Sequence, residues 1–109
     1  MKLVNLTPRA INIADEAGNV FRTIPPTPPA ARVSSESVVI GTIGGVPLTE
    51  TIFGEVENLP ELHCDIMYIV SQIVMSACPT RIDLVRPDTG PTCIRNTEGT
   101  IVAVRALTR

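Results

Sequence analysis

The sequence is short of aromatic residues. Among its 109 residues there is no tryptophan, and Phe21, Phe53 and Tyr68 are the only aromatic side chains. The core must therefore be built from aliphatic side chains, each of which buries less area than an aromatic ring. Hydrophobic residues still make up 44% of the chain, which excludes an intrinsically disordered protein. The length suits one domain over residues 1–109 with a thin stability margin, and we expect copies of the chain to associate into a homo-oligomer.

The sequence also lacks an excess of either charge and any long apolar run. Nine basic and eleven acidic residues give a net charge of −2, which disfavours broad electrostatic binding to nucleic acid. A membrane-spanning helix needs about 20 consecutive apolar residues, and no run approaches that length. The stretch Met1–Asn5 reaches a polar side chain too early for a secretory signal. We therefore expect no nucleic-acid partner, no membrane partner and an intracellular location.

Cysteine and histidine are sparse. Cys64, Cys78 and Cys93 are widely spaced and form no CxxC pair, and His63 is the only histidine. Zinc sites usually draw on closely spaced ligand pairs. An odd number of cysteines favours a reducing compartment over a disulfide-bonded secreted fold. We expect three reduced thiols packed as small apolar side chains, with no metal and no cofactor. A zinc site of His63, Cys64 and the distant cysteines is the alternative.

The first half of the chain predicts strands joined by turns. Residues 10–14 and 20–24 alternate apolar and polar side chains around the turn-forming segment 15–19, which is the pattern of a β-hairpin. The other segments that predict strands and their connections are 2–6, 31–43 and 46–53, with Gly44-Gly45 as a tight turn and 54–60 as an ordered loop.

The second half predicts a strand, a helix and a returning strand. Residues 66–70 are a continuous apolar run, as expected for a strand buried on both faces. Ser71 then acts as an N-cap for a short helix over 72–78. Residues 82–85 predict a strand parallel to the first. A second hairpin follows, with strands at 92–95 and 100–107. We predict an α+β fold, with a mostly antiparallel β-sheet, hairpins and one or two short helices.

The junction at Ser71 is a candidate anion site. The start of a helix presents free N–H groups, which favour a phosphate or carboxylate. Arg81 follows the helix and can add a two-point charged contact. The alternative is that Ser71 only caps the helix and Arg81 is a solvated side chain, because no glycine-rich phosphate loop precedes them.

Two polar loops stiffened by proline are further candidates. Segment 86–91 holds Asp88, Thr89 and Gly90 between two prolines, and segment 5–9 takes a strand into a proline-fixed corner. A rigid polar loop loses little entropy when it binds a ligand. The alternative is an ordinary connection between strands, where Asp, Gly and Pro are the commonest residues.

The sequence offers no catalytic constellation. Glu55, Glu57 and Glu61 can be interpreted as paired carboxylates, but a solvated acidic edge is the commoner arrangement. Acyl transfer by a serine is disfavoured because no GxSxG motif is present and His63 lies in a predicted loop. We therefore expect no catalytic residue and no enzyme activity.

Four phrases of the sequence together resemble a known family. They are Val4-Asn5-Leu6-Thr7-Pro8, Phe53-Gly54-Glu55-Val56-Glu57-Asn58-Leu59-Pro60, Tyr68-Ile69-Val70-Ser71 and Arg86-Pro87-Asp88-Thr89-Gly90-Pro91. The chain is similar, from Val4 to about Leu107, to small proteins of tailed phages and prophages that open with a VNLTPH-like segment. The histidine that follows proline in that family is Arg9 here, so any role of that histidine passes to a guanidinium or is lost.

The resemblance implies a small phage protein without an enzyme motif, in the cytoplasm of the bacterial host. Phages encode proteins that counter bacterial defence, including sponges that trap nucleotide immune signals. The matched phrases fall at strand ends and loops, where ligand pockets gather. We therefore expect an anti-defence protein that sequesters an ADP-ribose-type or cyclic nucleotide signal, with Phe53 or Tyr68 stacking on a base. The expected ligand-binding residues are Asn5, Thr7, Arg9, Phe53, Gly54, Tyr68, Ser71, Arg81, Asp83, Asp88, Thr89 and Gly90.

Two other functions stay open. One is a protein-binding inhibitor of a host defence protein or a structural phage component, which would use sheet edges and apolar surface. The other is a small nucleotide hydrolase that uses Asp83, Asp88 or Glu55 with water or a metal.

Overall fold

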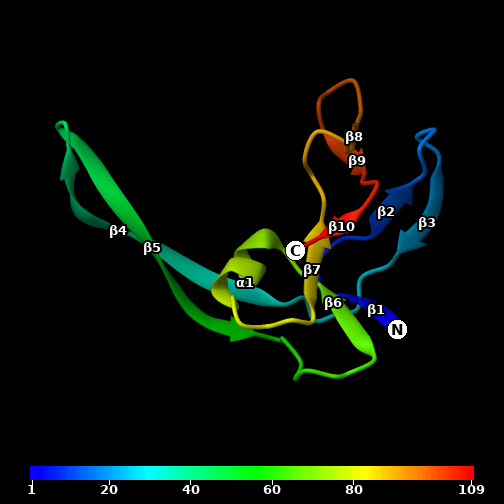
Figure 1. Cartoon of the computed structure of the whole chain (residues 1–109), viewed down its shortest axis with the longest axis horizontal. Coiled ribbons are helices and arrows are strands. Elements are labelled where there is room, and N and C mark those ends of the chain that lie inside the picture. The colour runs from blue at the N-terminus through cyan, green and yellow to red at the C-terminus, as the bar shows by residue number, and fades with distance from the viewer.

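The structure is a computed structural model that describes all residues 1–109, and it consists of short strands with one short helix (Figure 1). The elements in chain order are β1 (Lys2–Asn5), β2 (Ile11–Ala14), β3 (Val20–Ile24), β4 (Arg32–Ile43), β5 (Val46–Glu57), β6 (Ile66–Ile69), α1 (Gln72–Ala77), β7 (Leu84–Pro87), β8 (Ile94–Arg95), β9 (Ile101–Ala103) and β10 (Leu107–Thr108). The predicted hairpins and single short helix are confirmed, but with 50% of the residues in strands and only 6% in a helix the chain is mostly β and not α+β. None of its helical structure has the length and apolar character that crossing a membrane requires.

The central sheet has four strands in the order β1-β6-β7-β10. β6 pairs in parallel with both β1 and β7, and only β10 runs antiparallel to its neighbour. The expectation of a mostly antiparallel arrangement therefore holds for the hairpins and is wrong for this sheet. The reason is that the pairing of β1 with β6 joins segments far apart in the chain, and no local pattern encodes it.

The strand–helix–strand unit forms as the sequence predicts. α1 begins after Ser71, whose Oγ accepts a hydrogen bond from the Val74 amide at 3.4 Å. β7 begins at Leu84, two residues later than expected, and pairs in parallel with β6 through Tyr68 and Ile69. The Val70 amide extends this pairing by donating to the carbonyl of Val85 at 2.9 Å. The carboxyl ends of β6 and β7 therefore lie side by side.

The two terminal hairpins also form, with corrected lengths. β2 and β3 pair around a turn in which Gly18 has φ +88°, a conformation that favours glycine. β8 and β9 are shorter than the predicted segments, since Leu107 leaves the hairpin and joins the central sheet as part of β10. Leu107 and Thr108 pair with β7 at the edge of the central sheet, so they do not extend the hairpin of β8 and β9.

β4 and β5 form a long hairpin that we call the arm (residues 32–57). The tight turn at Gly44 and Gly45 is confirmed, with φ of +58° and +81°. The prediction of a loop from residue 54 is wrong, because β5 continues to Glu57 and pairs with Arg32. Figure 1 shows the arm leaving the rest of the molecule, and the chain measures 49 × 38 × 20 Å along its principal axes.

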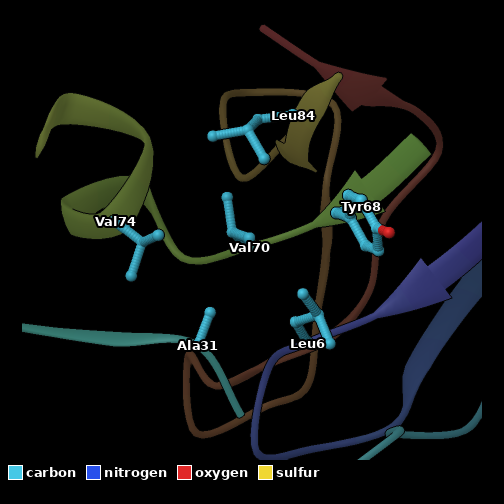
Figure 2. Packing of buried hydrophobic residues seen from close by; sticks show 6 residues of the cluster. All are labelled: Leu6, Ala31, Tyr68, Val70, Val74 and Leu84. Carbon is cyan, nitrogen blue, oxygen red and sulfur yellow. The ribbon is translucent and has the colours of Figure 1, made fainter. Parts of the chain in front are cut away.

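The core lies on both faces of β6. One cluster joins β6, α1, β7 and the start of the arm, and Figure 2 shows its side chains turned toward one another: Leu6, Ala31, Tyr68, Val70, Val74 and Leu84. The other cluster lies on the opposite face and consists of Ile11, Ile24, Ile69 and Val104. Ile69 and Val70 are both fully buried. The prediction of a strand buried on two faces is therefore confirmed.

Candidate functional site

A cleft lies at the edge of the central sheet where three parallel strands end. β1 leads into Thr7, β6 into Ser71 and β7 into Thr89, and all three residues line this cleft. Ligands of open sheets with parallel strands bind outside the carboxyl ends of the strands. The cleft has a volume of about 290 Å³, and its lining residues are Thr7, Pro8, Arg9, Ser71, Gln72, Arg86, Pro87 and Thr89. We call it the arginine cleft.

Arg9 and Arg86 give the arginine cleft its charge. Arg9 is exposed and Arg86 is half-buried, and no acidic side chain lines the cleft. The two ion pairs of the chain involve other arginines. A guanidinium binds phosphate or carboxylate oxygens through two parallel N–H groups. These two arginines make the arginine cleft a candidate anion site.

Asn5 shapes the wall that carries Arg9. Its Nδ2 donates to the carbonyl oxygens of Arg9 at 2.9 Å and Ile24 at 3.0 Å. Its Oδ1 accepts from the Thr7 amide at 2.9 Å and lies 2.6 Å from the Thr7 hydroxyl. Asn5 is 1% exposed, and these contacts use both hydrogens of its side-chain amide and its carbonyl oxygen, so none of these groups faces a ligand. Asn5, expected as a ligand-binding residue, instead holds the loop on which Thr7 and Arg9 are presented.

A second cleft adjoins the first and is mostly apolar. Its volume is about 210 Å³, and Pro87 and Thr89 line both clefts. The rest of its lining is Ala10, Ile11, Asn12, Ile101, Val102, Ala103 and Val104. We call it the apolar cleft. A charged and an apolar depression with a common wall suit a ligand that carries a phosphate and a flat apolar group.

Ser71 lies in the arginine cleft, but Arg81 does not. Arg81 donates to Asp83 through Nε at 2.8 Å and through Nη2 at 2.6 Å, and its Nη2 also donates to the Pro60 carbonyl at 2.8 Å. These residues precede β7, whereas Ser71 follows β6, so the two parallel strands place them at opposite ends of the sheet. The expected clamp of Ser71 and Arg81 on one anion is not formed.

Asp83 is occupied by the same pair. It is 2% exposed, and its hydrogen bonds from Arg81 hold the pKa of the carboxyl below its ordinary value of 3.8 against the opposing effect of burial. The pairing likewise raises the pKa of Arg81. The side chains of Arg81 and Asp83 thus neutralise each other and stabilise the start of β7.

The two aromatic candidates lie outside the arginine cleft. Tyr68 is 5% exposed and packs in the core cluster of Figure 2, so its ring offers no face to a base. Phe53 is half-buried on the arm, where it lines a separate depression with Gly54. A Cβ at Gly54 would meet the Ser34 hydroxyl, so the lack of a side chain at Gly54 leaves room for Ser34 on the other strand of the arm.

The loop after β7 contributes Thr89 and uses its other polar residues internally. Asp88 Oδ1 accepts a hydrogen bond from the Gly90 amide at 3.0 Å, and the Asp88 amide donates to the Ala106 carbonyl at 2.9 Å. A Cβ at Gly90 would lie 3.1 Å from Asp88 Oδ1, which explains a small residue there. Asp88 and Gly90 thus fix the turn that presents Thr89.

Gln72 and Arg86 line the arginine cleft but were not among the expected ligand-binding residues. Arg86 was assigned to a loop because Pro87 and Asp88 follow it, whereas β7 extends through Pro87. The available signal was the predicted parallel strand at 82–85, since side chains at the carboxyl end of such a strand face the ligand edge.

Potential metal ligands gather before β6. Donor atoms of His63, Cys64 and Asp65 lie within 4.8 Å of one another, and all three residues are exposed. The Asp65 amide donates to His63 Nδ1 at 3.2 Å, so a cation at that nitrogen would have to displace this bond. Cys78 and Cys93 pack against different core clusters, so they do not complete a site with His63 and Cys64.

Comparisons with known proteins find no match for this chain among protein-family models, curated proteins or solved structures. The chemistry of the two clefts therefore follows from their own residues. Two arginines, two threonines, one serine and one glutamine are among the residues that line the arginine cleft, beside an apolar depression.

Proposed function

We propose that this chain is a phage-encoded anti-defence protein of the host cytoplasm, which binds and sequesters a small nucleotide-derived immune signal. The observation that carries the proposal is that Arg9 and Arg86 line one cleft without a carboxylate partner. A nucleotide phosphate satisfies both guanidinium groups, because its oxygens accept two-point hydrogen bonds. Membership of the phage family rests on the resemblance of the four sequence phrases.

The apolar cleft supports a nucleotide over a simple anion. Inorganic phosphate fills only a charged site, whereas an ADP-ribose-type or cyclic nucleotide also has a base to bury. Ile101, Val102 and Val104 supply apolar contacts next to the shared wall of Pro87 and Thr89. Each cleft alone is smaller than the roughly 300–1,000 Å³ of an ordinary ligand pocket, and the two together fall within that range.

We further propose that binding occurs without turnover. Asp83 is held by Arg81, and Asp88 is held by the Gly90 amide. Glu55 lies with Arg32 and Glu57 in a depression of the arm. The carboxylates considered for a hydrolase are therefore not among the residues that line the arginine cleft, which supports a sponge over an enzyme.

A second candidate function is a protein-binding inhibitor or a structural phage component. The arm favours it, because the arm exposes aliphatic side chains such as Ile43, Val46 and Leu48. We also propose that the protein is a homo-oligomer, and the role of the arm in that association is argued below.

A thermal-shift panel of ADP-ribose derivatives and cyclic dinucleotides tests the sponge. A ligand present at 100 times its Kd stabilises the folded state by about 2.7 kcal/mol, which raises Tm by about 10 °C in a domain of this size. Ligand released by denaturing the protein is then identified by mass, and a sponge returns it unchanged. Unfolding temperatures that stay constant up to millimolar concentrations of every compound would contradict the proposal, and a chemically altered ligand would favour the hydrolase.

A further inference from the structure

The arm is the largest exposed feature of the molecule. From Ser34 to Glu55 every residue is exposed except Val38 and Phe53, which are half-buried. Only the base of the arm packs against the body, where Val33 and Val56 contact the first core cluster. A two-stranded hairpin surrounded by water is marginally stable at best. Something must therefore cover the outer part of the arm.

The two faces of the arm differ in chemistry. Cross-strand partners of an antiparallel pair share a face, so the register assigns each paired side chain to one side. Ile40 lies at an irregularity between Val39 and Gly41, has no cross-strand partner and is not assigned to either face. One face, which we call the aliphatic face, carries Val38, Ile43, Val46, Leu48 and Ile52 together with Gly41, Glu36 and Glu50. The opposite face carries mainly hydroxyl side chains, at Ser35, Ser37, Thr42, Thr49 and Thr51, with Val39, Pro47 and Phe53. The aliphatic face is the side that gains from being buried.

The chain exposes more surface than a compact monomer of its mass, and this excess area is large enough to form one protein interface. A compact monomer of this mass exposes roughly 5,900 Å², whereas this chain exposes 7370 Å², an excess of about 1,500 Å². The radius of gyration is 16.4 Å, against about 13 Å for a compact chain of this length. A stable interface of standard size buries about 800 Å² on each partner. The excess is large enough to supply such an interface.

The chemistry of the arm selects the kind of partner. Between residues 33 and 56 the arm carries Glu36, Glu50 and Glu55 and no lysine or arginine. An acidic arm repels nucleic acid and anionic membranes, which both need basic residues on the protein. The remaining occupant is an aliphatic protein surface.

The aliphatic face is complementary to a second copy of itself. Gly41 pairs with Leu48 across the arm, and no atom lies within 4 Å of the place where a Gly41 Cβ would be. The face therefore has a hole beside a large side chain. In a two-fold interface every contact between two different residues occurs twice, once in each direction. Leu48 of each copy can therefore fill the hole at Gly41 of the other copy.

We propose that two copies of this chain dimerise through the aliphatic faces of their arms, with Leu48 of each copy packed on Gly41 of the partner. This deepens the homo-oligomer part of the proposed function and does not depend on the nucleotide. No residue of the arm lines the arginine cleft, so the proposed contact does not use the residues of that cleft.

Sedimentation velocity of the full chain tests the dimer, using Leu48→Glu and the matched Thr49→Glu on the opposite face. We expect wild type and Thr49→Glu to sediment as dimers and Leu48→Glu as a monomer. Interfaces of this size bind with micromolar or tighter Kd, so a wild type that is monomeric at roughly 100 μM overturns the proposal. Equal loss of the dimer in both variants overturns the assignment of the face.

The variant Gly41→Val distinguishes a specific packed interface from non-specific hydrophobic association. A Cβ at this position meets no atom within 4 Å apart from its chain neighbours, and Gly41 lies on an exposed face, so we expect the monomer to accommodate the valine. It fills the hole, so the proposal predicts at least a tenfold weaker dimer, whereas unspecific apolar association would strengthen. An unchanged or tighter dimer in Gly41→Val overturns the proposed contact. Nucleotide thermal shifts measured on Leu48→Glu keep the two proposals distinguishable, because loss of the dimer leaves the arginine cleft intact.

Discussion

Arg9 and Arg86 line the same cleft although they are 77 positions apart in the chain, and neither has a carboxylate partner. The hydrogen bonds of Asn5 fix the loop of Arg9, while the pairing of β7 with β6 and β10 fixes Arg86. Two arginines without a carboxylate partner on one cleft can both bind the oxygens of a single anion. This juxtaposition is the structural reason to expect a phosphate ligand.

Arg86→Ala tests the charge of the cleft. One charge-assisted hydrogen bond contributes about 1.5–3 kcal/mol, so we expect nucleotide affinity to fall about tenfold to a hundredfold. Arg22→Ala on β3 removes an exposed arginine outside the cleft and should leave affinity unchanged. Calorimetric titration of both variants at low and high salt is the measurement. Wild-type affinity should also decrease with salt, because an exposed contact is screened. Equal affinities of wild type and Arg86→Ala would exclude this cleft as the anion site.

Asn5→Ala tests the support of the Arg9 loop. The change takes their Asn5 partner from the Ile24 carbonyl and the Thr7 amide, whereas the Arg9 carbonyl keeps a donor in the Thr7 hydroxyl. Buried groups left unpaired cost about 1–3 kcal/mol each. We expect a loss of about 2–4 kcal/mol in the free energy of unfolding, measured with urea. Asn96→Ala is the control, since Asn96 also bonds its own loop but is exposed, and its loss should be about 1 kcal/mol. Similar losses in the two variants would contradict the special role of Asn5.

Ser71→Ala tests the cap of α1. The hydroxyl accepts one long bond from the Val74 amide, so the loss of stability should be about 0.5–1 kcal/mol. The Ser71 hydroxyl also lines the arginine cleft, so nucleotide affinity should fall, though by less than in Arg86→Ala. Urea unfolding and titration of the same sample separate the two effects. A loss of stability above 2 kcal/mol would show that Ser71 does more than cap the helix.

Arg81→Ala tests the ion pair that precedes β7. Removing the arginine leaves Asp83 buried and unpaired, which should cost about 3 kcal/mol of stability at pH 7. Arg32→Ala breaks an exposed pair with Glu57 and should cost less than about 1 kcal/mol. Because Arg81 is outside the arginine cleft, Arg81→Ala should leave nucleotide affinity unchanged at temperatures where the variant is folded. A large loss of affinity in the folded variant would place Arg81 in the binding site after all.

The same pair predicts a pH dependence. Arg81 lowers the pKa of Asp83 in the folded state, so the stabilisation is complete above the ordinary pKa of 3.8 and is lost as the pH falls through the lower folded value. In Arg81→Ala the lowering effect of Arg81 on the pKa of Asp83 is lost, and burial, which raises that pKa, is opposed only by a backbone hydrogen bond. The difference in stability between wild type and variant should therefore shrink from pH 7 to about pH 3. A difference that stays constant over this range would contradict the assigned pair.

Local signals in the sequence account for the hairpins and the helix. The β2–β3 hairpin follows from alternating residues around a turn with Gly18, and α1 follows from the cap at Ser71. The parallel pairing of β1 with β6 was not predictable in this way, because about sixty residues separate the two strands and a strand's partner leaves no local mark.

The candidate site was predictable in its loops and less so in its side chains. Thr7, Arg9, Ser71 and Thr89 do line the arginine cleft. Asn5 and Asp88 instead bond their own loops, because short polar side chains near a turn bond the adjacent backbone. Arg81 was placed beside Ser71 on its distance from the helix end, whereas its partner is the carboxylate two residues further along the chain.

A mass spectrum of small molecules released from the purified protein tests the central claim most directly. The protein is produced in bacteria that express a synthase of nucleotide immune signals, washed and denatured. We predict that wild type releases a phosphate-containing nucleotide in near-equimolar amount, whereas Arg9→Ala/Arg86→Ala purified in the same way releases little of it. Release of no such compound from wild type, or of equal amounts from both proteins, would contradict a nucleotide sponge built on the arginine cleft.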